Sequence, residues 1–132
     1  MASLDHLKIL INLARIDGTV ADREKIYIID IGRANGIYPD EIQPLFEKQH
    51  EVILPVNLSP DQKFEYVFHL VQLMKIDERM YKEEILYCST IASRLGYRKE
   101  VMAELMLSVK NEAMNASDVN SLRNLIAPYL EK

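Results

Sequence analysis

The sequence predicts an all-α protein: a compact bundle of about seven helices that forms a single domain over residues 1–132. Three observations indicate this class. Apolar residues recur at helical spacing along most of the chain, and no segment shows the apolar–polar alternation of a strand. Two stretches of sequence, 10–37 and 70–97, repeat each other without a gap. With 132 residues, 48% of them hydrophobic, the chain is long enough for one real core.

The repeat carries most of the information about architecture. Residues of the first stretch that are identical to those 60 positions later are Leu10, Leu13, Ile16, Asp17, Glu24, Tyr27, Ile31 and Gly36. Each copy has an apolar helical stripe, a short acidic corner and a second helical stripe that ends at a glycine. We therefore predict two helix–corner–helix units, at about 10–37 and 70–97, related by an internal pseudo-twofold axis.

In the first half, Ser3 is a suitable N-cap for the first helix, which is broken by Asp17-Gly18-Thr19. The second helix stops at Gly36, a residue expected in the left-handed region after a helix end. Pro39 suits the first turn of a short third helix. The predicted helices of this half are 3–16, 21–35 and 39–49.

In the second half, residues 50–58 are too few for a domain boundary and too apolar to hang free, so we expect a connector laid over the core. Ser59-Pro60-Asp61 has the cap and first-turn proline of a fourth helix. The fifth helix ends at Gly96, and Ser117 is the expected cap of the last. The helices predicted after the fourth are 81–95, 99–114 and 117–130.

The segments 21–35 and 81–95 are apolar nearly all round, which is typical of buried helices. We therefore expect these two helices to form the centre of the bundle. Gly32 and Ala92 occupy matching positions in them. A mid-helix glycine costs about 1 kcal/mol relative to alanine, so we expect a close backbone approach between the two helices at Gly32 and Ala92.

Composition excludes several classes of function. The net charge of −4 argues against a nucleic-acid-binding protein, which needs a basic face. We expect no transmembrane segment, because there is no run of eighteen apolar residues, and no secretory signal at the N-terminus. The single cysteine, Cys88, suits a cytoplasmic protein and lies in an apolar run, where a buried core role is expected. No pair of histidines or cysteines has the spacing of metal ligands, and His69 is expected to pack rather than ligate.

The acidic corners imitate half of a calcium-binding EF-hand loop. With Asp17 at the fifth position of such a loop, Gly18, Val20 and Glu24 fall where the motif requires them. However, Leu13 and Arg15 stand where oxygen ligands are needed, and the second copy has Leu73 and Lys75 there. Because these side chains cannot donate oxygen ligands, we exclude a true EF-hand.

Four carboxylates remain as a candidate metal site: Asp17, Glu24, Asp77 and Glu84. If the pseudo-twofold axis brings the two corners together, they could hold one divalent cation, Ca²⁺ or Mg²⁺. The alternative is structural, since a Glu at the third helical position can accept a bond from the N-cap amide. A further acid, Asp30, lies in an aliphatic run and is expected to pair with Arg33 or Arg15.

At these corners the chain resembles the tellurite-resistance TerB-like family. The shared pattern runs from Leu10 through Leu13, Asp17 and Gly18 to Glu24, with a second copy from Leu70 to Glu84. The resemblance covers about residues 3–107. It implies a compact helical bacterial domain that takes part in stress response or membrane-associated complexes, with a proposed divalent-metal site at Asp17, Glu24, Asp77 and Glu84.

We therefore expect a non-enzymatic TerB-like domain of a bacterial stress response, with protein partners and a divalent cation as the candidate cofactor. The alternative is a protein-binding adaptor or scaffold whose acidic corners are purely structural. A third interpretation, a carboxylate–metal hydrolase, is disfavoured because the sequence offers no cluster of histidine ligands.

Overall fold

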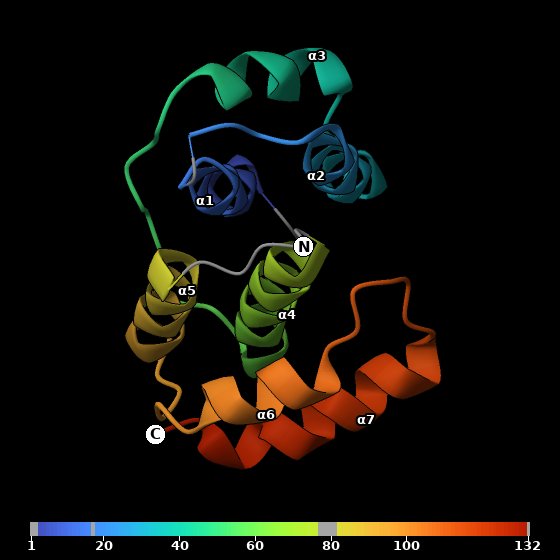
Figure 1. The fold of residues 1–132 in the computed structure, drawn as a ribbon. Helices are drawn as coiled ribbons and strands as arrows, with labels where there is room; N and C mark the ends of the chain where they lie inside the picture. Colours follow the sequence, from blue (N-terminus) through green and yellow to red (C-terminus); the bar gives the residue numbers. More distant parts are fainter. Residues whose placement is uncertain (1–2, 17, 77–81, 132) are drawn as a thin grey trace.

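The computed structural model describes residues 3–16, 18–76 and 82–131, and these form an all-α bundle, as the sequence predicts (Figure 1). Two short 3₁₀ helices, Gln43–Glu47 and Ala127–Tyr129, follow α-helices directly. The α-helices within the described ranges are α1 (Leu4–Ala14), α2 (Asp22–Ala34), α3 (Pro39–Ile42), α4 (Pro60–Ile76), α5 (Lys82–Arg94), α6 (Val101–Ser108) and α7 (Ala116–Ile126). None of these helices is long and apolar enough to cross a membrane.

Several helix ends lie where the local sequence predicts them. The Ser3 hydroxyl accepts a hydrogen bond from the His6 amide at 3.3 Å, which caps α1. Ser59 and Gln62 exchange two such bonds, of 3.2 and 2.8 Å, before the first turn of α4. Gly36 and Gly96 have φ angles of 81° and 101°, the left-handed conformation expected after a helix.

The C-terminal helices differ from the prediction. The helix expected over 99–114 ends at Ser108, and α7 is capped by Asn115, whose side chain accepts from the Asp118 amide at 2.8 Å, rather than by Ser117. The early end has a physical reason. The carbonyls of Val109 and Lys110 accept hydrogen bonds from side chains of α4, so they do not need the next helical turn.

Helices α1 and α4 form the centre of the bundle (Figure 1). They pack against each other, and each also contacts α2 and α5. Every residue of α1 from Ile9 to Ala14 is buried, and α4 is buried at Phe64, Leu70 and Leu73. Helices α6 and α7 pack on each other, and α6 also contacts α4. The Tyr129 carbonyl after α7 accepts a hydrogen bond from the Arg98 amide before α6 at 2.7 Å.

The prediction that 21–35 and 81–95 lie at the centre is wrong. Helices α2 and α5 lie on the outside of α1 and α4 (Figure 1). Each buries one stripe, and Ile26 and Leu86 at matching positions are 59% and 56% exposed. Apolar content alone therefore misled the prediction, because several of these aliphatic residues face outward.

The close approach expected between Gly32 and Ala92 is also wrong. Gly32 of α2 lies against α1 and α3, where an added Cβ would be 2.4 Å from Ile42 Cδ1 and 3.1 Å from Leu7 Cδ1. Because Gly32 has no side chain, the buried side chains of Ile42 and Leu7 can pack close to the backbone of α2. The pseudo-twofold relation between the two halves stays a prediction from the sequence.

We predict that Gly32→Val destabilises the protein by about 2 kcal/mol, because its side chain overpacks the contact with Ile42 and Leu7. Ala34→Val, on the exposed side of the same helix, is the matched control and costs only the difference in helix propensity, about 0.6 kcal/mol. Urea unfolding of both variants measures the difference. Equal losses of stability would contradict the close packing at Gly32.

Candidate functional site

The two glutamates of the predicted metal site lie at matching places in the fold. Glu24 is in the first turn of α2 and Glu84 in the first turn of α5, and each is 3% exposed. A carboxylate this buried needs compensating interactions. Glu24 obtains one from its own helix start, since its Oε1 accepts a hydrogen bond from the Ala21 amide at 3.1 Å. This bond is the structural alternative expected from the sequence.

The other two predicted ligands, Asp17 and Asp77, lie outside the described residues. Within the described ranges, no three Asp, Glu, His or Cys side chains come together in a group that could hold a metal ion. That the four carboxylates meet around one cation therefore stays a prediction.

Two other expectations from the sequence have clear outcomes. Cys88 is buried at 1% exposure, and burial raises the pKa of its thiol to about 12, which fits an inert core residue. Asp30 was expected to be buried and paired, but it is exposed on α2. It needs no internal partner there, and it lines a groove beside α2.

This groove lies between α2, α4 and the segment 111–114 that follows α6, and its volume is about 890 Å³. That is within the range of about 300–1,000 Å³ typical of ligand-binding clefts. Helix α2 contributes Arg23, Ile26, Tyr27, Asp30, Ile31 and Ala34. Phe68, Gln72 and Ile76 of α4 form the floor, and Met114 contributes to the third wall.

A hydrogen-bonded chain holds the three walls together. The Tyr27 hydroxyl of α2 donates to Gln72 Oε1 at 2.8 Å, and Gln72 Nε2 donates to the carbonyls of Lys110 at 3.0 Å and Glu112 at 2.9 Å. One turn along α4, Lys75 Nζ donates to the Val109 carbonyl. Gln72 is only 7% exposed, so each of these bonds is made away from bulk water. The groove is thus fixed in shape before anything binds.

The residues of the other copy that match Gln72, Tyr27 and Lys75 make related contacts elsewhere in the bundle; they are Asn12, Tyr87 and Arg15. Asn12, which stands 60 residues before Gln72, donates to the His50 carbonyl and accepts from the His50 amide, both at 2.7 Å. Tyr87 donates to the Ile9 carbonyl at 2.9 Å, and Arg15 donates to the Phe46 carbonyl at 2.8 Å. In each half, a polar side chain of the central helix therefore binds the backbone that follows the third helix.

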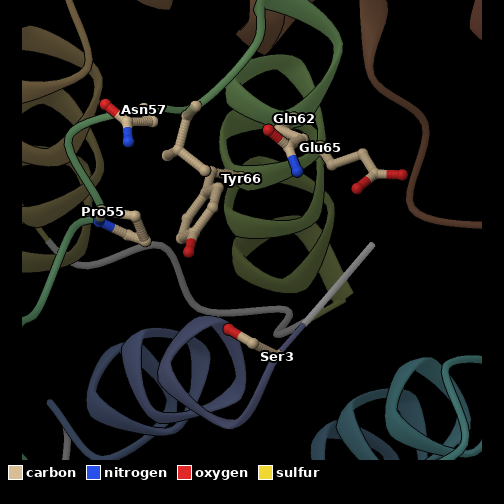
Figure 2. A pocket seen from close by; sticks show the side chains of 7 residues that line it. Ser3, Pro55, Asn57, Gln62, Glu65 and Tyr66 are labelled. Atoms are coloured by element: carbon tan, nitrogen blue, oxygen red, sulfur yellow. The ribbon is translucent and has the colours of Figure 1, made fainter.

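A second, smaller hollow lies between the start of α1, the connector and α4, with a volume of about 260 Å³ (Figure 2). Figure 2 shows Tyr66 between Pro55 and Ser3, with Asn57 and Gln62 above it. This volume is below the usual range for ligand sites. Gln62 is also committed to its bond with Ser59. The hollow is therefore the weaker candidate.

The structure also joins two histidines that sequence reasoning treated as separate. His6 of α1 and His69 of α4 share a hydrogen bond of 2.9 Å between Nε2 and Nδ1, and the His6 ring lies 4.2 Å from the ring of Tyr66. Burial lowers the pKa of His6 to about 3, with His69 as the next cause, and burial lowers the pKa of His69 to about 4. Both rings are therefore neutral near pH 7 and act as packing polar groups.

No protein-family model, curated protein or solved structure matches this chain.

We predict that the histidine pair makes the protein sensitive to mild acid. In the unfolded chain each imidazole takes up a proton near pH 6.5, whereas in the folded protein it does so only near pH 3 to 4. The unfolded state therefore binds more protons between these values, and the free energy of unfolding falls as the pH drops through this window.

Urea unfolding at pH 7 and pH 5 measures this effect. Between these values the protein should lose roughly 2 to 4 kcal/mol more stability than the double variant His6→Phe with His69→Leu. The comparison concerns only the dependence on pH, so a change in overall stability does not affect it. The same loss in both proteins would contradict neutral burial of the pair.

Proposed function

We propose that this chain is a non-enzymatic protein-binding domain, and that partners dock in the groove between α2, α4 and residues 111–114. The observation that carries the proposal is the groove itself, which combines an apolar lining with a shape fixed by hydrogen bonds. A surface ordered in advance loses little conformational entropy on binding. This corresponds to the adaptor alternative drawn from the sequence.

The polar groups in the groove favour binding over catalysis. Tyr27 and Gln72 are bonded to each other, and Gln72 uses its amide protons on backbone carbonyls. Burial raises the pKa of Tyr27 above its ordinary value, so its hydroxyl stays protonated near neutral pH. These groups support the shape of the groove rather than offering a poised acid or base.

The outward position of Ile26 also supports the proposal. It lies in the groove at 59% exposure, on a helix whose inner stripe is already buried. Burying the rest of its side chain on a partner would be favourable by about 1–2 kcal/mol, the exposed share of the value for full burial. The resemblance of the corners to TerB-like domains adds a cytoplasmic bacterial stress response, of the tellurite-resistance type, as the proposed context.

Site-specific photo-crosslinking tests this function. A photoreactive phenylalanine analogue at position 26 should capture a protein from an extract of the native cell, because this position faces the groove. The matched control is position 86, which has nearly the same exposure on α5. Equal capture at positions 26 and 86, or no capture at 26, would contradict docking in the groove.

A divalent metal site at the acidic corners is the second candidate. The observation that favours it is the deep burial of Glu24 and Glu84 at matching helix starts. A cation shared with Asp17 and Asp77 would offset the cost of burying these carboxylates.

Calorimetric titration with Ca²⁺, Mg²⁺, Mn²⁺ and Zn²⁺ tests the metal candidate. Metal binding should release or absorb heat. It should also raise the melting temperature of the protein, because a ligand that binds only the folded state stabilises it. Both effects should disappear in the double variant Asp17→Asn with Asp77→Asn. A flat titration, with a melting temperature that neither metal nor the variant alters, would exclude the site.

A further inference from the structure

We infer that the groove takes an amphipathic α-helix of a partner protein, about three turns long, with Lys or Arg beside its apolar face. This inference rests on the proposed protein-binding function and specifies the partner.

The length of the groove matches a helix. On α2 it is lined from Arg23 to Ala34 by residues at intervals of three and four. These residues form one uninterrupted helical face of about 16 Å, at about 1.5 Å per residue. A helix lying along this face would pack ridges of side chains between those of α2 and α4, as helices do within the bundle.

Backbone chemistry favours a helix over an extended peptide. Extended peptides that add a strand bind through main-chain hydrogen bonds to the edge of a sheet. Two of the groove's walls are helices, and the carbonyls of Lys110 and Glu112 in the third wall already accept bonds from Gln72. In the described part of the chain, the only β-type pairing is one bridge between Tyr97 and Leu130, neither of which lines the groove. A helix brings its own hydrogen bonds, so it leaves no backbone group unsatisfied in an apolar groove.

Charge indicates the flanking residues of the partner. Asp30 on α2 and Glu112 on the third wall are exposed carboxylates that line the same groove from opposite sides. Arg23 lies at one end, seven residues before Asp30 on the same face. The whole chain has a net charge of −4. Complementary charges select partners and speed their encounter, so a basic helix is favoured, and an anionic lipid surface is disfavoured.

The matching helix α5 has a neighbour that α2 does not have in its groove, the connector at its C-terminal end. The connector runs beside α5 (Figure 1), where Leu54, Pro55 and Val56 share a hollow with Arg94 and Leu95. Ile91 of α5 is 1% exposed, whereas Ile31, which matches it in α2, is only partly buried. Ile31, on the groove face of α2, is therefore more accessible to a partner than Ile91 is in α5.

Fluorescence anisotropy with two labelled model peptides tests the inference. Both are helical peptides of about 18 residues with Leu at i, i+3, i+4 and i+7; one has Lys beside this face and the other has Glu. The Lys peptide should bind at least about tenfold more tightly than the Glu peptide. Ile26→Gln should weaken binding of the Lys peptide by at least about tenfold, whereas the control Leu86→Gln should change it by less than about twofold.

A second variant tests the contribution of the two groove carboxylates. Asp30→Asn with Glu112→Gln should reduce the preference for the Lys peptide to less than about threefold, and high salt should do the same. Circular dichroism checks that each variant stays folded, and all the substituted residues are exposed.

Two outcomes would overturn the inference: equal binding of the Lys and Glu peptides, or binding of the Lys peptide that Ile26→Gln does not change. A dimer in sedimentation experiments that Ile26→Gln dissolves would assign the groove to a second copy instead. If the peptides fail while crosslinking at position 26 still captures a protein, the helical partner is wrong and protein binding stands. If crosslinking at position 26 also falls to the level at 86, both are wrong.

Discussion

The buried side-chain amide of Gln72 is the interaction on which the groove depends. It lies on a central helix and connects α4 to Tyr27 of α2 and to the backbone after α6. A buried amide left without partners would cost about 1–3 kcal/mol, so the surrounding chain is arranged to satisfy it. This requirement explains why α6 ends at Ser108. The next carbonyls accept hydrogen bonds from side chains of α4 instead of from the amides of another helical turn. Residues 111–114 are thereby held on α4, and the groove lies between them, α4 and α2.

The core of the bundle follows from a different constraint. Helices α1 and α4 bury almost every side chain along their central turns, so the outer helices need only one apolar stripe each. The second set of aliphatic residues on α2 and α5 is then not required for folding. On α5 this set leaves Leu86 at the surface, whereas on α2 it lines an open groove. Large exposed aliphatic residues such as Ile26 lower solubility without stabilising the isolated domain, and a binding partner would explain their presence.

Sequence reasoning predicted the features that depend on neighbouring residues. The all-α class, the caps at Ser3 and Ser59 and the left-handed glycines at Gly36 and Gly96 are all confirmed. It failed where distant parts of the chain meet. Nothing local shows that Lys110 and Glu112 would bind Gln72, or that His6 would reach His69, 63 residues away. The one available indication was the alignment of Asn12 with Gln72, two amides at matching places in apolar stripes. The predicted metal ligands Glu24 and Glu84 were found to match in burial, while Asp17 and Asp77 lie outside the described residues.

The central claim is that the bond between Tyr27 and Gln72 is formed and energetically coupled in the folded protein. A double-mutant cycle of Tyr27→Phe and Gln72→Met, followed by urea unfolding, tests it directly. Methionine keeps the length of the side chain, and both substitutions remove the hydrogen-bonding groups without a large loss of volume. The account predicts a coupling energy of about 1 kcal/mol or more between the two positions. Additive losses, within about 0.3–0.5 kcal/mol, would show that the two residues act independently and would contradict it.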